Sequence, residues 1–121
     1  MRPDDKDMAR LWDMLDAGRA AIEFTQGRRF EDLLADRMFR SALERTFEII
    51  GEAARRVSGK TRSALPDIPW RSMIGLRNIL AHEYDEIRYE ILWKLCRNEL
   101  PLLIGQLVAL GADNPPLEED Q

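Results

Sequence analysis

The segment Arg77-Asn78-Ile79-Leu80-Ala81-His82-Glu83-Tyr84 contains the only histidine of the 121-residue chain. Histidine is the side chain whose ordinary pKa lies nearest to neutral pH, so His82 is the first candidate for a proton transfer. Arg77 precedes it by five residues and Tyr84 follows it by two. A cation, an imidazole and a phenol therefore lie within one short stretch, and helical spacing decides which of them face the same way.

Read as one helix that turns by about 100° per residue, the segment and its flanks separate an apolar side from a polar one. The apolar side consists of Met73, Leu76, Ile79, Leu80 and Ile87. Arg77, Ala81 and Tyr84 form a stripe beside it, and the next stripe consists of Asn78, His82 and Asp85. The polar groups share one sector that suits a phosphate. The alternative, a solvated histidine near a helix end beside a surface arginine, is left open by spacing alone.

Three stretches together resemble one protein family. Leu76 to Tyr84 is similar to the Arg-x4-His-x-Tyr signature of HepT-type HEPN-domain proteins, and so is the lead-in Ile68-Pro69-Trp70-Arg71. Upstream, Ile49-Ile50-Gly51-Glu52-Ala53-Ala54 resembles a second segment of that family. The resemblance covers roughly residues 45 to 90, and the three stretches follow one another in the same order as in the family. The remainder of the chain agrees only in its helical pattern.

The resemblance implies an all-α, HEPN-like fold, and the chain's own pattern agrees with it. No strand alternation, internal repeat or glycine-rich phosphate loop occurs, so we expect an up-and-down bundle of four to five helices. Residues 1–110 are predicted to form this single domain. Residues 111–121, which contain two adjacent prolines and an acidic run, are expected to be a disordered tail or a partner contact.

The first half of the chain predicts two helices. Residues 4–25 carry apolar side chains at three- and four-residue steps, and Gly27 is a plausible cap at the end of that helix. Residues 30–58 predict one long second helix. Its main stripe is expected to consist of Leu34, Met38, Ala42, Phe47, Ile50, Ala54 and Val57.

The second half predicts a loop, the motif helix and a last helix. The proline-rich stretch from Ser58 to about Pro69 is expected to be a loop, with Pro69 in the first turn of the motif helix. The last helix is predicted to run from about Arg88 and to be kinked or broken at Pro101. The very apolar segment 102–110 is expected to pack on both sides.

Charge is unevenly distributed along the chain. The net charge is −4, yet residues 28–77 carry eleven basic and seven acidic groups, and residues 78–121 carry three basic and nine acidic groups. The basic excess is almost all arginine, whose planar fork suits phosphate contacts, and it leads into the motif. The alternative for any one arginine is a solvated helix face with mixed charges.

Several function classes are disfavoured by composition. A single cysteine, Cys96, excludes an intrachain disulfide and a cysteine metal cluster, and its apolar surroundings suggest a small core residue. No apolar stretch is long enough to span a membrane, and the N-terminal residues lack the core of a signal peptide. We therefore expect no membrane partner and a cytoplasmic location.

The resemblance implies a metal-independent endoribonuclease, the toxin of a type VII-like toxin–antitoxin pair, with RNA as substrate and no cofactor. The residues suit that chemistry, because a ribose 2′-hydroxyl attacks its neighbouring phosphate once a base removes its proton. His82 would exchange the proton, Arg77 would neutralise charge on the phosphate, and Asn78 would hold a phosphate oxygen or the imidazole. The sequence shows no cluster of ligands that calls for a metal.

Two further residues receive roles from the resemblance. Glu52 would face the motif helix and orient Arg77 or His82, whereas helical spacing alone predicts that it forms ion pairs with Arg56. Tyr84 would be the site at which a minimal nucleotidyltransferase antitoxin attaches AMP.

One histidine for each chain points to an assembly. Transesterification of this kind works best with both a base and an acid, and HEPN proteins meet that need by pairing two motifs across a dimer cleft. We therefore expect a homodimer. The alternative functions are a non-catalytic helical module that docks a minimal nucleotidyltransferase, and an unrelated structural bundle.

Overall fold

The computed structural model describes the backbone of residues 3–81 and 85–114, and the side chains of residues 3–81 and 88–114. Within these ranges the chain is helical and forms no strand, which confirms the all-α, HEPN-like bundle. The elements are α1 (Asp5–Thr25), α2 (Phe30–Ala35), α3 (Arg37–Arg56), α4 (Gly59–Ala64), α5 (Trp70–Ile74), α6 (Leu76–Leu80), α7 (Asp85–Lys94), η1 (Leu95–Glu99) and α8 (Leu100–Ala109).

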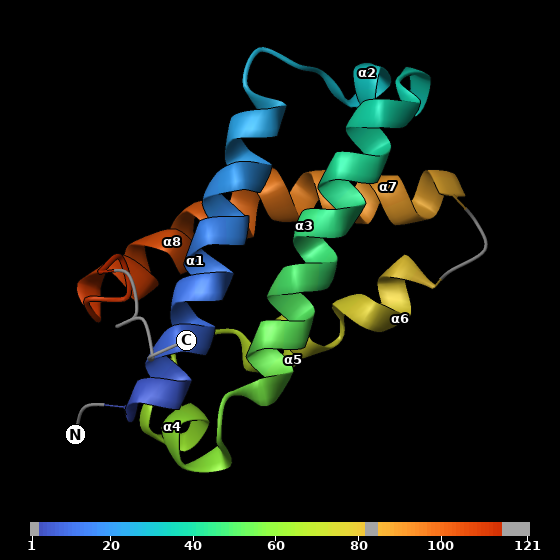
Figure 1. Cartoon of the computed structure of the whole chain (residues 1–121). Helices are drawn as coiled ribbons and strands as arrows, with labels where there is room; N and C mark the ends of the chain where they lie inside the picture. Colours follow the sequence, from blue (N-terminus) through green and yellow to red (C-terminus); the bar gives the residue numbers. More distant parts are fainter. Residues whose placement is uncertain (1–2, 82–84, 115–121) are drawn as a thin grey trace, which may run out of the picture.

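The bundle is built on the antiparallel pair α1 and α3 (Figure 1). Behind this pair α7, η1 and α8 run as one long rod that crosses both helices in Figure 1. The rod contacts α1 through α8 and η1, and α2 through α7. The short helices α5 and α6 pack against α3, so the motif arginine is carried by a small element on the outer side of the central pair.

The first helix agrees with its prediction. Asp4 caps α1 by accepting a hydrogen bond from the backbone N–H of Asp7 at 2.8 Å. After the helix ends at Thr25, Gly27 adopts φ +70°, a left-handed conformation that glycine reaches without a steric penalty. The predicted helix over residues 4–25, and the prediction that Gly27 forms the cap at its end, are therefore confirmed.

The predicted single helix 30–58 is wrong, because the chain breaks at Asp36. Asp36 has extended backbone angles, and its carboxylate accepts hydrogen bonds from the N–H groups of Met38 and Phe39 at 3.0 and 3.2 Å. The other carboxylate oxygen of Asp36 accepts a hydrogen bond from the guanidinium of Arg28 at 2.8 Å. An aspartate that caps a new helix in this way ends the previous one, and apolar periodicity carries no sign of it.

The break shifts the phase of the buried face. Leu33, Phe39 and Leu43 are buried, whereas the predicted stripe members Leu34 and Met38 are 38% and 81% exposed. Beyond the break the prediction is correct, because Phe47, Ile50, Ala54 and Val57 all lie in the core.

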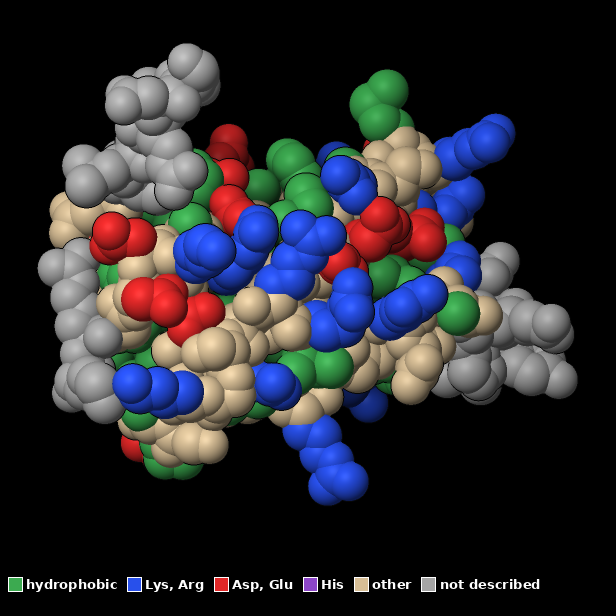
Figure 2. Space-filling model, turned by 60° about the horizontal axis from the view of Figure 1, so that its bottom comes forward, with side chains coloured by type: hydrophobic (Ala, Val, Ile, Leu, Met, Phe, Trp, Pro, Cys, Tyr) green, Lys and Arg blue, Asp and Glu red, His purple; other side chains and the backbone are tan. Residues whose placement is uncertain are grey.

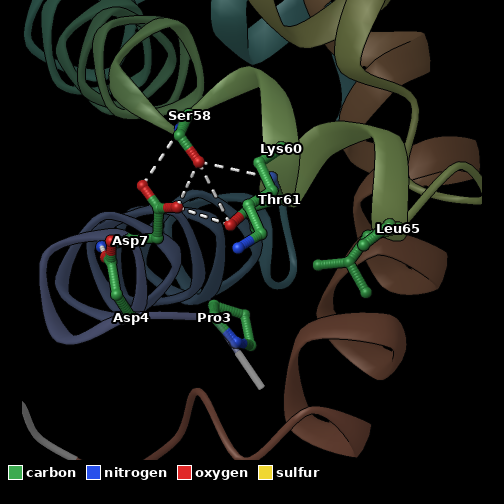
Figure 3. A pocket seen from close by; sticks show the side chains of 8 residues that line it. Pro3, Asp4, Asp7, Ser58, Lys60, Thr61 and Leu65 are labelled. Carbon is green, nitrogen blue, oxygen red and sulfur yellow. Dashed lines mark hydrogen bonds between the residues drawn. The ribbon is translucent and has the colours of Figure 1, made fainter. Parts of the chain in front are cut away.

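The predicted loop 58–69 is also partly wrong, because it contains α4. Ser58 caps this helix by accepting a hydrogen bond from the N–H of Thr61 at 3.2 Å. Asp7 of α1 accepts hydrogen bonds from the Ser58 N–H at 3.0 Å, the Ser58 hydroxyl at 2.6 Å and the Thr61 hydroxyl (Figure 3). Burial by itself would raise the pKa of Asp7, but these hydrogen bonds together hold the pKa below its ordinary value.

The motif helix divides at Gly75. The Asn78 N–H donates to the Gly75 carbonyl three residues back at 3.0 Å, so the helical ladder tightens there and α5 and α6 become separate elements. Trp70 packs the start of α5, and its indole N–H donates to the Leu65 carbonyl at 2.9 Å. Pro69 lies at the N-cap position of α5, next to the predicted first turn.

The last helix begins at Asp85, before the predicted Arg88, and is interrupted near Pro101 as predicted. The interruption is the π turn η1, after which Pro101 occupies the first turn of α8, where a missing N–H is tolerated. Leu103 and Leu107 of α8 are buried, but Leu102 is 70% exposed. The expectation that segment 102–110 packs on both sides is therefore wrong within this chain.

The helix α8 ends in a glycine cap. Gly111 has φ +81°, and the Ala112 N–H donates to the Leu107 carbonyl at 3.1 Å. Ala112 is buried, so the chain stays tied to the domain for a few residues beyond 110. The remaining part of the predicted tail, residues 115–121, lies outside the described residues. No helix in the described part of the chain has the length and apolar character needed to cross a membrane.

Candidate functional site

The motif arginine lies on the exposed side of α6. Leu76 is buried in the core at the start of this helix, while Arg77 and Asn78 are exposed and Ala81 follows them at the surface. This is the order that the motif's spacing predicts for one apolar and one polar side. The predicted catalytic His82 and the predicted modification site Tyr84 lie outside the described residues.

Gly51 determines how closely α6 approaches α3. A Cβ atom at this position would lie 3.1 Å from the Met73 carbonyl oxygen and 3.4 Å from the Leu76 Cβ atom. The first of these distances is tighter than a normal contact, so the absence of a side chain allows the α5–α6 junction to rest directly on α3. The close contact brings Glu52, the next residue of α3, to the edge of the motif helix.

A pocket of about 420 Å³ lies between α3 and the α5–α6 segment. Glu52 and Arg77 both line it, so the structure brings these two predicted site residues to one hollow. Asn78 is exposed but does not line the pocket. Its lining consists of Glu48, Gly51, Glu52, Arg55, Ile74, Arg77, Leu80 and Ala81.

The surface around the C-terminal end of α3 is rich in arginine and lysine. Figure 2 shows basic side chains gathering in a band across the face that is seen when the lower end of Figure 1 is turned forward, with acidic side chains among them. Arg55, Arg56 and Lys60 are exposed at the end of α3 and in α4, and Arg71 and Arg77 are exposed on α5 and α6. An anionic ligand that reaches Arg77 therefore meets further positive charge on the neighbouring elements.

Glu52 is held by its own helix. Its Oε1 atom accepts hydrogen bonds from Arg55 at 2.7 Å and from Arg56 at 3.1 Å, and the hydrogen bond from Arg55 is the main cause that lowers the pKa of Glu52. The ion pair with Arg56 agrees with helical spacing, whereas Glu48 pairs with Arg45 at 2.6 Å. The role of Glu52 in orienting Arg77 or His82 stays a prediction.

A network that the sequence did not reveal holds the end of the motif helix. The guanidinium of Arg88 donates to the Leu80 carbonyl at 3.0 Å and to the Tyr89 hydroxyl at 2.7 Å. That hydroxyl donates to Glu44 Oε1 at 3.0 Å, and Arg88 lies 3.7 Å from the second oxygen of the same carboxylate. The Arg88 guanidinium also stacks over the Tyr89 ring at 4.8 Å.

This network joins three elements, because Leu80 ends α6, Glu44 lies on α3, and Arg88 and Tyr89 lie on α7. The Arg88 side chain is only 15% exposed, which makes these charge-assisted contacts stronger than a surface pair. The one signal in the sequence is that Arg88 is one of only three basic residues after position 77. Its partner on α3 is 44 residues away, so no local pattern identifies the pair.

Cys96 agrees with its predicted structural role. It is buried in η1, and burial raises the pKa of its thiol to about 12. The thiol is therefore protonated and unreactive at neutral pH. Elsewhere in the described part of the chain, His, Cys, Asp and Glu side chains form no group of three or more that could hold a metal ion.

The fold and the site together define an all-α HEPN-like domain that presents its motif arginine beside a pocket on α3. The chain belongs to the ribonuclease HepT-like family, whose model matches residues 14–110.

Curated relatives are similar over most of their length. A Methanocaldococcus jannaschii protein named "Putative RNase MJ1380" is 41% identical over 77% of this chain and 85% of its own. The "Probable ribonuclease HepT" of Thermococcus cleftensis is 36% identical over 83% of this chain and 91% of its own. A second M. jannaschii protein, "Putative RNase MJ0127", is 36% identical over 87% of each chain. No solved structure matches the chain significantly.

Proposed function

We propose that this protein is an endoribonuclease that cleaves RNA without a metal ion and acts as the toxin of a toxin–antitoxin pair. The observation that carries the proposal is the match of residues 14–110 to the ribonuclease HepT-like family, in a chain that retains Arg77, His82 and Tyr84 at the motif's spacing. The exposed position of Arg77 beside a pocket supports it, because a phosphate can reach the guanidinium there.

The reaction is transfer of the phosphate from the leaving ribose to the neighbouring 2′-oxygen. A base removes the 2′-hydroxyl proton, the 2′-oxygen forms a bond to phosphorus, and the bond from phosphorus to the 5′-oxygen breaks. The 5′-oxygen takes up a proton, which leaves a cyclic phosphate and a 5′-hydroxyl. His82 is assigned the proton transfer and Arg77 the stabilisation of charge on the phosphate oxygens. Asn78 supports a phosphate oxygen or the imidazole.

Glu52 has a supporting role in this proposal. It lines the same pocket as Arg77, and its Oε1 atom holds Arg55 in place at 2.7 Å. A carboxylate whose pKa is lowered stays ionised at neutral pH, so it keeps the neighbouring guanidinium groups oriented. The wall of the pocket beside Arg77 thus carries a carboxylate that is paired with Arg55 and Arg56.

Two chains are proposed to form the active assembly. A single histidine cannot serve as base and acid in the same turnover unless it exchanges its proton between steps, and a homodimer supplies two copies. Exposed apolar side chains on the rod, Ile91, Leu102 and Val108, support an interface of this kind.

Neutralisation is assigned to a minimal nucleotidyltransferase antitoxin that attaches AMP to Tyr84. The added phosphodiester carries a negative charge two residues from His82 and seven from Arg77 in the sequence. It would compete with the RNA phosphate for the arginine and repel incoming RNA.

The proposal is tested by cleavage of an RNA pool with the purified protein in EDTA. We expect cleavage that leaves cyclic phosphate ends. Both Arg77→Ala and His82→Ala should lose this cleavage, and the melting temperature of each variant should stay near that of the wild-type protein. Arg19→Ala, which removes an exposed charge on α1 that does not line the pocket, is the matched control. Full cleavage by His82→Ala would overturn the mechanism. Binding of a nucleotidyltransferase without any cleavage would instead identify a docking module.

A further inference from the structure

The pocket beside Arg77 is more than a site for a phosphate, because its walls are of mixed character. Ile74, Leu80 and Ala81 supply apolar surface, and Gly51 adds a stretch of bare backbone. At about 420 Å³ the hollow has the size of a small-ligand site. Flat, largely apolar groups with polar edges fit such walls better than a fully hydrated anion does.

Charge on the α3 wall also disfavours a second phosphate. Glu48 and Glu52 both line the pocket, and Arg55 forms an ion pair with Glu52 at 2.7 Å. Of the pocket's guanidinium groups, only Arg77 lacks an ion pair among the described residues. The balance of charge thus suits one phosphate at Arg77 and an uncharged group with hydrogen-bond donors beyond it.

Glu48 is the carboxylate with capacity to bind such a group. Its Oε1 atom accepts a hydrogen bond from the Arg45 guanidinium at 2.6 Å, while its Oε2 atom accepts no hydrogen bond from the described residues. The pair with Arg45 is well exposed on both sides, and exposed pairs of this kind are weak. Glu48 can therefore turn toward the pocket at little cost, whereas two arginines hold Glu52.

We infer that this pocket binds a nucleobase next to the cleaved phosphate and that Glu48 selects guanine there. The inference rests on the proposed ribonuclease function, because Arg77 places the phosphate within one nucleotide of the pocket. A carboxylate presents two acceptors side by side. Guanine alone among the four bases presents two adjacent N–H donors, N1–H and the N2 amino group, on its Watson–Crick edge, and unpaired RNA bases are read on that edge.

The other three bases fit less well. Adenine and cytosine place a ring nitrogen acceptor beside their amino group, and that acceptor would face a carboxylate oxygen. Uracil offers a single N–H between two carbonyl oxygens, both of which a carboxylate repels. The pocket therefore converts a nuclease with general affinity for RNA into one with a preferred base beside the cleaved bond.

The test compares short RNAs that differ only in the base on either side of the cleaved bond, including inosine, which lacks the N2 amino group of guanine. The wild-type protein should prefer guanine over each other base, and inosine should be cleaved about tenfold more slowly or worse, the loss expected for one arm of a bidentate contact. Glu48→Gln should lose most of this preference and should no longer distinguish guanine from inosine.

Glu23→Gln, which removes an exposed glutamate on α1 away from the pocket, is the matched control and should keep the wild-type preference. A wild-type protein that cleaves RNA with no preference for guanine would overturn the inference, and so would a guanine preference that survives in Glu48→Gln. A wild-type protein that cleaves none of the RNAs would instead overturn the proposed function. Melting curves for both variants establish that the fold is intact.

Discussion

The guanidinium of Arg88 donates a hydrogen bond to the backbone carbonyl of Leu80, 3.0 Å away and eight residues earlier in the chain. In the sequence, residues 81–87, which include His82, lie between Leu80 and Arg88. This hydrogen bond therefore joins the two residues that flank this motif segment. Glu44 and Tyr89 fix Arg88 in turn, so the contact is anchored to α3. A residue that acts on the reaction through the placement of another is a positioning residue, and we assign Arg88 this role.

We expect Arg88→Met to reduce the rate of RNA cleavage by about tenfold or more, because the ends of the motif segment lose their common anchor. The chain has one histidine, so the imidazole proton signal of His82 is unique in an NMR spectrum, and its titration should shift in this variant. Arg97→Met is the matched control, since Arg97 also donates to a carbonyl, that of Arg28, and stacks over a ring, that of Trp93. An unchanged His82 titration in Arg88→Met would contradict the assignment.

The contact of Gly51 with the α5–α6 junction gives a second prediction. Gly51→Ala should destabilise the protein by about 1–3 kcal/mol, because its Cβ atom would press on the Met73 carbonyl, and this outweighs the gain in helix propensity. Gly105→Ala, at an exposed position of α8 where an added Cβ meets nothing within 4 Å, should instead stabilise it by about 0.5–1 kcal/mol. Urea unfolding curves of the two variants measure the difference, and equal effects would refute the close-packing argument.

Asp7 makes stability depend on pH. Its pKa is lowered in the folded state, so its contribution is fully present above the ordinary value of 3.8 and is lost as the pH falls through the folded-state pKa. Asp7→Asn should cost about 1–3 kcal/mol at pH 7, since the amide cannot accept all three hydrogen bonds from Ser58 and Thr61. The difference in the free energy of unfolding between the wild-type protein and Asp7→Asn should become smaller below about pH 3.8. Asp5→Asn, at an exposed position in the same helical turn, is the control for unfolding at each pH.

The exposed side chain of Leu102 predicts self-association. Light scattering at micromolar concentration should give twice the chain mass of 14.0 kDa, and Leu102→Glu should shift the protein toward the monomer because a buried unpaired charge opposes the interface. Cleavage activity should fall with the dimer fraction. A wild-type monomer that cleaves RNA at full rate would contradict the proposed shared site.

Tyr84 is expected to be needed for neutralisation and not for cleavage. Tyr84→Phe should keep much of the ribonuclease activity, because the proposed reaction assigns no proton transfer to the phenol, yet should escape inactivation by the nucleotidyltransferase. Intact mass after incubation with that partner, ATP and magnesium measures the outcome. The same added adenylyl mass on wild-type protein and on Tyr84→Phe would exclude Tyr84 as the modified residue.

Apolar periodicity predicted those parts of the fold in which burial decides the conformation. The span of α1 and the buried face of α3 from Phe47 to Ala54 both follow from it. The motif's spacing also predicted correctly that Arg77 lies outside the core, beside Ala81. In each case the deciding interaction lies within one or two helical turns.

The errors share a different cause. Asp36 caps α3 and Ser58 caps α4, because the side chain of each accepts hydrogen bonds from backbone N–H groups, and no hydrophobic pattern records such caps. The hydrogen bond between Tyr89 and Glu44 joins residues 45 positions apart, so only the packed structure brings them together. Sequence reasoning found the motif but not the network that holds its end.

The adjacent residues Gly51 and Glu52 tie both the packing of the α5–α6 junction and the wall of the pocket to the register of α3. Deleting any one residue between Ala42 and Gly51 would advance the following helix by about 100° and bring Glu52 into the place of Gly51. The side chain of a glutamate would then meet the Met73 carbonyl, which would lie only 3.1 Å from its Cβ atom, and the pocket wall would turn away from Arg77. Within this helix, a substitution at an exposed position leaves the pocket wall in place, whereas a change of length rotates that wall away from Arg77.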